Sequence, residues 1–203
     1  GPCRRVVLQG VLQEGGGHHR LSVLDLGFNA IGDEGCGSLA THCLAGNLNL
    51  QTLYLSGNRF GERGALSIAM GIIHGSGLRT LHLTANAIGP VGARAVVGAI
   101  AQNEVRVATA QATGQVDATE VGRLEELHLG ATEITADGFL SIPAMLLSNS
   151  ALKVLSVANN NLNDQDVTLL GQALSQNRRV PLESLLLSFN EISCKGVENL
   201  MNA

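Results

Sequence analysis

The chain has 203 residues, with 13 Lys and Arg against 17 Asp and Glu and a formal net charge of −4. This charge provides no general attraction for nucleic acid or for an anionic membrane, because that attraction requires clustered Lys and Arg. No uncharged apolar stretch reaches the roughly 18 residues that a membrane-spanning helix needs, so we expect none. Hydrophobic residues form 45% of the chain and aromatic residues only 2%, so the core must consist of small and aliphatic side chains.

The cysteines predict free thiols. Cys3, Cys36, Cys43 and Cys194 have neither C-x-x-C spacing nor the density of a disulfide-stapled secreted domain. None of the fifteen asparagines begins an N-x-S/T glycosylation triplet. Both observations favour an intracellular protein, cytoplasmic or nuclear.

A repeat occupies the chain from residue 21 onward. Six segments fit the pattern LxxLx(L/V)xx(N/T)x(apolar) without gaps. They begin at Leu21, Leu50, Leu78, Leu124, Leu152 and Leu182. These first leucines are separated by 29, 28, 46, 28 and 30 residues, so one long step contains an insertion of about 18 residues.

Each repeat is predicted to begin with a short strand, because the alternation in LxL points the leucines to one face. A helix follows each strand, and strands joined by helices form a parallel sheet. We therefore expect an α/β solenoid of six repeats, a horseshoe segment with parallel strands on the concave face and helices on the convex face. The whole chain, residues 1–203, then forms a single repeat domain.

In the first three repeats, the turns IGDEG, FGERG and IGPVG indicate where each helix begins. Small and aliphatic residues then recur at helical spacing, which predicts one inward stripe per helix. The stripes are Cys36, Leu39, Ala40 and Cys43 in the first unit and Ala65, Ile68, Ala69 and Ile72 in the second. The two cysteines are accordingly interpreted as small hydrophobic core residues without a metal or redox role.

The insertion between the third and fourth repeats spans residues 104–123. It is rich in Ala, Thr, Val and Gln and lacks the bulk to form a core of its own. We expect a flexible insertion loop, with a short hairpin around Thr113 and Gly114 or a partner-binding arm as alternatives. In the helix after the insertion, Pro143 should cause a kink or an early end.

The ninth repeat position carries Asn in five repeats and Thr132 in the fourth. An amide at this position can bond backbone groups where the strand ends, and successive amides would build a buried polar ladder. The hydroxyl of Thr132 can make part of those bonds, so we expect a local irregularity there. The predicted ladder consists of Asn29, Asn58, Asn86, Asn160 and Asn190.

Both ends of the repeat array lack the polar cap that shields a terminal layer. Residues 4–14 are similar to the helix of a preceding unit, and the last helix, which contains Lys195, stops where another strand would follow. We expect a fragment of a longer solenoid, whose oligomeric state the sequence leaves open.

The repeat length and the IGDEG-type turns resemble the ribonuclease-inhibitor-like subfamily of leucine-rich repeats. This subfamily includes ribonuclease inhibitor, the Ran GTPase-activating protein and the C-terminal regions of NOD-like receptors. The resemblance covers residues 21–203 and implies an intracellular protein that binds other proteins. Two alternatives stay open, namely the ligand-sensing region of a NOD-like receptor and a GTPase activator of the Ran type, although the functional residues of that activator find no match here.

Residues between the leucines should project onto the concave face and form columns across the repeats. The predicted partner-binding surface consists of Asp25, Tyr54, His82, Glu126 and His128, because these residues offer the most hydrogen-bonding and contact capacity. Small residues at the seventh position leave room beside them. At the eighth position, Phe28 and Phe189 are expected to fill the turn, with a role as exposed anchors as the alternative.

His82, Glu126 and His128 also match the residue types of a zinc ligand set. Imidazoles on an open sheet are commonly solvated, however, and the sequence supplies no outer partners for a metal site, so no metal and no cofactor are predicted. No HExxH, GxSxG or GxxxxGK(S/T) motif is present. The sequence therefore predicts a non-catalytic module that binds a protein partner, with nucleic acid and membrane disfavoured.

Overall fold

The computed structural model describes residues 21–113 and 122–203. The helix expected over residues 4–14, the thiol of Cys3 and the hairpin position Gly114 lie outside the described residues.

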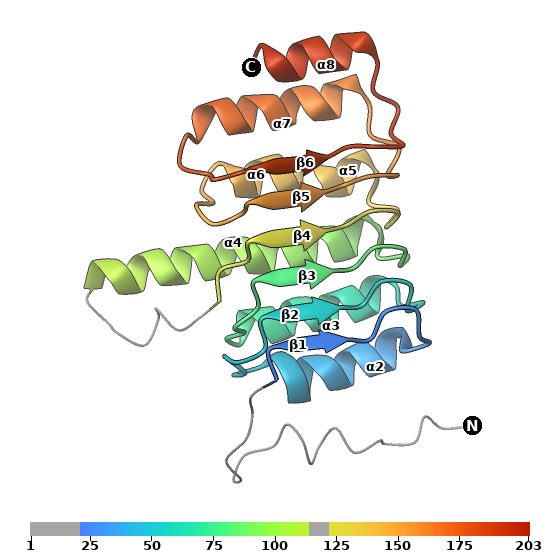
Figure 1. The fold of residues 1–203 in the computed structure, drawn as a ribbon, viewed down its shortest axis with the longest axis vertical. Coiled ribbons are helices and arrows are strands. Elements are labelled where there is room, and N and C mark those ends of the chain that lie inside the picture. Colours follow the sequence, from blue (N-terminus) through green and yellow to red (C-terminus); the bar gives the residue numbers. More distant parts are fainter. Residues whose placement is uncertain (1–20, 114–121) are drawn as a thin grey trace.

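In the described part of the chain, six short strands form one parallel sheet, and their order in the sheet follows the sequence (Figure 1). The strands are β1 Val23–Asp25, β2 Thr52–Tyr54, β3 Thr80–His82, β4 Glu126–His128, β5 Val154–Ser156 and β6 Ser184–Leu186. Equivalent repeat positions face each other, as Leu81 does with Leu53 on one side and Leu127 on the other. This arrangement confirms the predicted α/β solenoid of six repeats.

Helices form a second layer, which in Figure 1 lies behind the middle of the sheet and continues above and below it at the two ends. They are α2 Gly32–Leu39, a π-helical turn η1 Ala40–Leu44, α3 Glu62–Ile73, α4 Gly89–Thr113, α5 Thr135–Phe139, α6 Ser141–Leu146, α7 Asp164–Gln176 and α8 Cys194–Met201. Among the described residues, no helix combines the length and the apolar character that crossing a bilayer requires.

The core lies between the two layers and consists of leucines from the strands and small residues from the helices. Leu53, Leu81, Leu127 and Leu155 are fully buried, whereas Leu24 of β1 is only partly buried because a described repeat covers it on one side only. Both predicted helical stripes are confirmed. Their buried members are Cys36, Leu39, Ala40, Cys43, Ala65, Ile68, Ala69 and Ile72.

Helix α4 continues for 25 residues and reaches beyond the sheet in Figure 1. The prediction of a loop is therefore wrong for residues 104–113. Val107 and Ala110 are buried and prolong the inward stripe of the helix, and the Ala, Gln and Arg residues around them favour helix. Arg106 also donates a hydrogen bond from Nη1 to the carbonyl oxygen of Ile73 at 2.8 Å, which fastens the extension to α3.

The helix of the fourth repeat is divided into two pieces, because α5 ends at Phe139 and α6 begins at Ser141. Pro143 is the third residue of α6, where its missing N–H costs little. Its ring is incompatible with a helical carbonyl four residues earlier, at Phe139. The predicted interruption is thus confirmed, and the break lies ahead of the proline.

Candidate functional site

The open sheet face, defined as the face turned away from the helices, carries the third and fifth positions of each repeat. These positions flank the central leucine of each strand, which is fully buried in β2 to β5, so their side chains alternate with it. The fifth-position column is Asp25, Tyr54, His82, His128, Ser156 and Leu186.

Three aromatic rings of this column form a continuous stack in the middle of the sheet. The ring centroids of Tyr54 and His82 lie 4.4 Å apart, and those of His82 and His128 lie 3.9 Å apart with planes only 9° from parallel. Parallel strands separate equivalent residues by about 4.8 Å, so the register alone brings these rings into contact. Their mutual contact leaves each ring only partly exposed.

The structure brings together four of the five residues predicted for partner binding. Glu126 belongs to β4 together with His128 and points to the same face. The fifth, Asp25, is exposed on β1, at the edge of the described sheet, and its carboxylate accepts a hydrogen bond from the amide of Gly27 at 2.9 Å. This carboxylate is thus partly engaged with its own turn.

Both histidines of the stack are uncharged at neutral pH. Burial lowers the pKa of His82 to about 4, and the nearby His128 acts in the same direction while Asp25 opposes it. Burial also lowers the pKa of His128, against an opposing influence from Glu126. The separation of 3.8 Å between His128 Nε2 and Glu126 Oε2 is too long for a hydrogen bond.

The turn that follows each strand has a left-handed residue at the eighth repeat position in all six repeats. The values of φ lie between 51° and 65°, and the residues are Phe28, Gly57, Ala85, Ala131, Asn159 and Phe189. Gly and Asn adopt this conformation readily, whereas a bulky residue does so at a cost of about 1–2 kcal/mol. The fold therefore holds two phenylalanines in an unfavourable backbone conformation.

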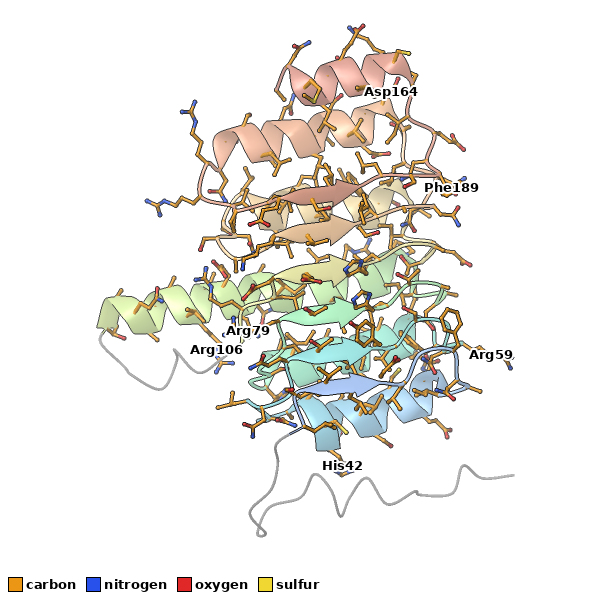
Figure 2. The ribbon with its side chains drawn as sticks, viewed as in Figure 1. His42, Arg59, Arg79, Arg106, Asp164 and Phe189 are labelled. Carbon is orange, nitrogen blue, oxygen red and sulfur yellow. The ribbon has the colours of Figure 1, made fainter. Side chains whose placement is uncertain are left out.

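Phe28 and Phe189 are 83% and 88% exposed, so the expectation that they fill the turn is wrong. The left-handed backbone directs each ring outward, and Figure 2 shows Phe189 at the edge where the strands end. Phe28 lies over Gly57 of the next repeat, where any added Cβ would come within 2.6 Å of the Phe28 ring. Exposed aromatic rings of this kind are suited to contact with a partner.

The ninth position places its amides at the ends of the strands, on the side of the turn. Asn58, Asn86 and Asn160 are buried, Asn190 is half-buried and Asn29 is exposed. Asn86 donates from Nδ2 to the carbonyl oxygens of Leu55 at 2.9 Å and Leu83 at 2.8 Å, thereby bonding two repeats at once. In the fourth repeat, the hydroxyl of Thr132 donates to the carbonyl of Leu129 at 2.6 Å. A hydroxyl has a single hydrogen, so it replaces only part of what the amide does.

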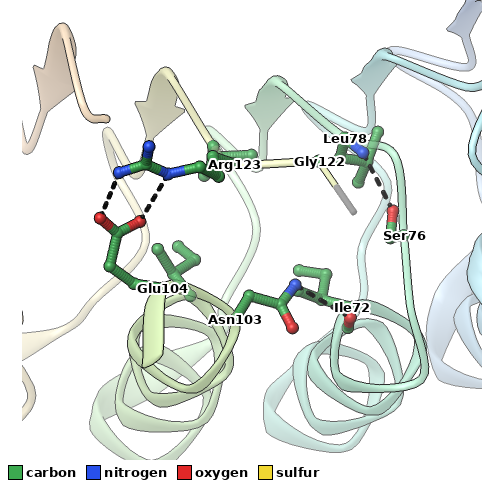
Figure 3. A pocket seen from close by; sticks show the side chains of 9 residues that line it. Ile72, Ser76, Leu78, Asn103, Glu104, Gly122 and Arg123 are labelled. Carbon is green, nitrogen blue, oxygen red and sulfur yellow. Dashed lines mark hydrogen bonds and ion pairs between the residues drawn. The ribbon is translucent and has the colours of Figure 1, made fainter. Parts of the chain in front are cut away.

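Where α4 meets the start of the fourth repeat, the structure contains a partly buried ion pair that was not foreseen from the sequence. Glu104 accepts hydrogen bonds from the guanidinium of Arg123 (Figure 3). It also accepts hydrogen bonds from the hydroxyl and the amide of Ser150. The adjoining cavity measures about 10 Å³, close to the size of one water molecule. This region joins repeats and is too small for a ligand.

A second charged group lies at the edge where the strands begin. Glu125 Oε1 pairs with Arg79 at 2.5 Å and Glu125 Oε2 pairs with Lys153 at 2.6 Å, so three neighbouring repeats are bridged. The sequence indicates this group, because Arg79, Glu125 and Lys153 alternate in charge at the second position of three successive repeats. Arg79 and Lys153 remain about half exposed, so the contribution of these pairs to stability is small.

The parallel sheet, the buried leucines and the repeated asparagine turn together define a leucine-rich-repeat solenoid. In agreement, a family model described as Leucine Rich repeat matches residues 18–40, 46–69 and 78–97. With its 28-to-30-residue repeat, the chain is a leucine-rich-repeat protein of the ribonuclease-inhibitor-like type.

Several relatives match nearly the whole chain. Over 90% of its length, the chain is 30% identical to NACHT, LRR and PYD domains-containing protein 3 of Bos taurus, of which it spans 16%. Over 89% of its length, it is 28% identical to ribonuclease inhibitor of Sus scrofa, of which it spans 36%. The chain therefore corresponds to a minor part of each relative. Leucine-rich-repeat proteins generally bind other proteins.

Proposed function

We propose that the chain is a non-catalytic protein-interaction module whose open sheet face binds a protein partner. The observation that carries this proposal is the central stack of Tyr54, His82 and His128, with Glu126 beside it. Tyrosine supplies a large contact area at a low entropic cost, and the neighbouring polar groups give orientation. Asp25 extends the same surface toward β1.

The side chains beside the aromatic stack leave room for a partner to contact it. Position seven of each repeat is Gly, Ala, Ser or Thr, so partner side chains find room beside the stack. The exposed ring of Phe28 lies at the turn edge of the same repeat as Asp25 and offers an apolar contact at the rim. The proposed surface thus combines an aromatic centre with a mixed rim, as protein interfaces commonly do.

The test is quantitative capture of partners by the full-length protein. We expect Tyr54→Ala, His82→Ala and His128→Ala in one chain to reduce the captured amount of a specific partner at least about tenfold, which corresponds to 1.4 kcal/mol. The matched control changes three exposed residues on the outer surface of α3, Arg63→Ala, Leu66→Ala and Met70→Ala. An identical set and amount of partners for both triple variants would contradict the proposal.

Photo-crosslinking locates the contact directly. A photoreactive phenylalanine analogue replaces Tyr54 on the open sheet face in one sample and Leu66 on α3 in another. We expect the partner to crosslink at position 54 and not at position 66. Crosslinking confined to position 66 would move the interface to the helices.

A second candidate function is the ligand-sensing region of a NOD-like receptor. The specific observation that favours it is the match over 90% of this chain to a protein whose name states that it contains NACHT, LRR and PYD domains. The discriminating measurement is the sequence of the full-length gene. A nucleotide-binding domain upstream of the repeats supports the receptor, whereas other interaction repeats there support a scaffold.

A further inference from the structure

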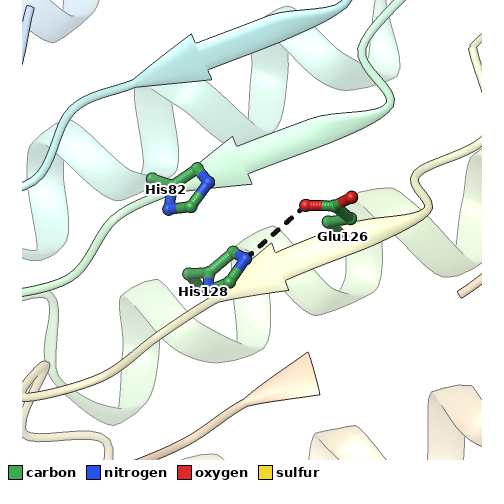
Figure 4. Close-up of side chains that lie close together, drawn as sticks. All are labelled: His82, Glu126 and His128. Atoms are coloured by element: carbon green, nitrogen blue, oxygen red, sulfur yellow. Dashed lines mark ion pairs between the residues drawn. The ribbon is translucent and has the colours of Figure 1, made fainter. Parts of the chain in front are cut away.

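Three potential metal ligands converge at the centre of the open sheet face. His82 comes from β3, and Glu126 and His128 come from β4 (Figure 4). One nitrogen of each imidazole and one carboxylate oxygen all lie within 4.8 Å of one another. The parallel register fixes this grouping, because it places His82 directly opposite His128.

The separations are close to those that one metal ion requires. Two ligand atoms bound tetrahedrally to one zinc ion, with bonds near 2.1 Å, lie about 3.4 Å apart. His128 Nε2 and Glu126 Oε2 are 3.8 Å apart, a few tenths of an ångström more than this separation, and the other pairs of ligand atoms lie within 4.8 Å. The side chain of Glu126 is 43% exposed and can make this adjustment by rotating.

His128 Nε2 gives an independent indication that a ligand belongs here. This nitrogen is buried, yet it has no hydrogen-bond partner within residues 21–113 and 122–203. A buried polar atom without a partner costs about 1–3 kcal/mol. An ion between His128 and Glu126 would satisfy both groups.

We propose that His82, Glu126 and His128 form a binding site for a divalent transition-metal ion such as Zn²⁺. The donor set decides the class of ion, because imidazole nitrogens suit zinc and its neighbours whereas Mg²⁺ and Ca²⁺ prefer oxygen alone. Three protein ligands on an open face leave a fourth position for water. This proposal goes beyond partner binding and does not depend on it.

Binding should change the stacking of the two rings. An ion bound to an imidazole lies near the plane of that ring, and the planes of His82 and His128 are parallel and stacked. One ring must therefore turn about its side-chain bonds when both bind the same ion.

Calorimetric titration with zinc chloride tests the site in the full chain. The protein is first freed of metal with EDTA, and His18→Gln and His19→Gln are introduced so that those two residues contribute no ligands. We expect one Zn²⁺ per chain in this background. We expect His82→Gln, Glu126→Gln or His128→Gln to weaken binding by at least about 100-fold, since loss of an outer partner alone costs 10–100-fold.

The controls are His42→Gln and His74→Gln, which change exposed histidines on the helical side of the chain and should leave the affinity unchanged. A second measurement uses the unaltered open face, so it stands even if a ligand variant fails to fold. Imidazole NMR signals of His82 and His128 should shift on addition of zinc while those of His42 and His74 stay in place. Absence of saturable binding, or equal affinity in ligand and control variants, would overturn the proposal.

Discussion

The backbone amide of Asn58 donates a hydrogen bond of 2.7 Å to the side-chain oxygen of Asn86, which lies 28 residues further along the chain. The amide nitrogen of Asn86 returns bonds to carbonyls of both repeats. The buried side chain of Asn86 thereby provides hydrogen-bond partners for backbone groups of two successive repeats. The spacing of 28 residues brings these two repeats together.

Replacing this side chain should therefore weaken two repeats together. We expect Asn86→Ala to lower the free energy of unfolding by about 2–4 kcal/mol, because it leaves several buried backbone groups without partners. Urea denaturation measures the loss. Asn86→Thr should lose less, since Thr132 fills the same position in the fourth repeat. Asn29→Ala is the control at an exposed position, and an equal loss there would refute the explanation.

Asp33 caps the helix of the following repeat. Its Oδ1 accepts hydrogen bonds of 2.8 Å from the amides of Gly61 and Gly64, at the start of α3. We expect Asp33→Ala to destabilise the chain by about 1–2 kcal/mol, as loss of a helix cap does. Glu34 is also acidic and in the first turn of α2 but is exposed, so Glu34→Ala should cost far less. Equal losses would mean that the helix dipole, and not the bond between repeats, accounts for the effect.

The pair of Glu104 and Arg123 predicts a pH dependence of stability. Burial alone would raise the pKa of Glu104, but hydrogen bonds from Arg123 and Ser150 and the charge of Arg123 outweigh it and lower the pKa. A carboxylate with a lowered folded pKa contributes stability above its unfolded value of 4.5, and this contribution is lost as the pH falls through the folded pKa. The ion pair thus stabilises the fold at neutral pH and not in acid.

Glu104→Gln isolates that contribution. We expect the variant to be less stable than the parent by about 1–3 kcal/mol at pH 7, and the difference to shrink toward zero once Glu104 is protonated in the folded parent. Urea unfolding at a series of pH values gives the curve. Glu34→Gln, at an exposed position, should show little difference at any pH. A difference that stays constant between pH 7 and pH 3 would exclude this assignment.

The thiols should differ sharply in reactivity. Burial raises the pKa of Cys36 to about 12, with a further contribution from Asp33, and the pKa of Cys43 to about 11, whereas Cys194 is exposed. In a Cys3→Ser background, we expect one thiol to react rapidly with a colorimetric disulfide reagent and two to react only after unfolding in urea. Rapid reaction of more than one thiol in the native protein would contradict the described core.

The repeat pattern predicts most of the fold because leucine spacing determines both the strands and their register. Once Leu53, Leu81 and Leu127 are aligned, His82 must lie opposite His128, so their proximity was predictable. The parallel stacking of the rings and the buried Nε2 of His128 depend on side-chain torsions, which no spacing rule contains. The composition of the open face was thus available from the sequence, and its detailed geometry was not.

The errors have identifiable physical causes. The extension of α4 was missed because low side-chain bulk suggested a loop, although Ile100, Val107 and Ala110 continue a helical stripe. The exposure of Phe28 and Phe189 follows from a left-handed backbone, which Gly57, Ala85 and Asn159 share without any common residue type. The repeat imposes a left-handed backbone at the eighth position, but the residue types there differ too much for the sequence to predict it.

The strand order of the sheet has a consequence for how the molecule opens. Because each of the six strands within residues 21–113 and 122–203 pairs only with its sequence neighbours there, the repeats can detach one at a time, and stability propagates through nearest-neighbour interfaces. Amide hydrogen exchange in this 203-residue chain should therefore be fastest in β1 and β6 and slowest in β3 and β4. The strands that carry His82 and His128 would keep their arrangement while the outer repeats fray.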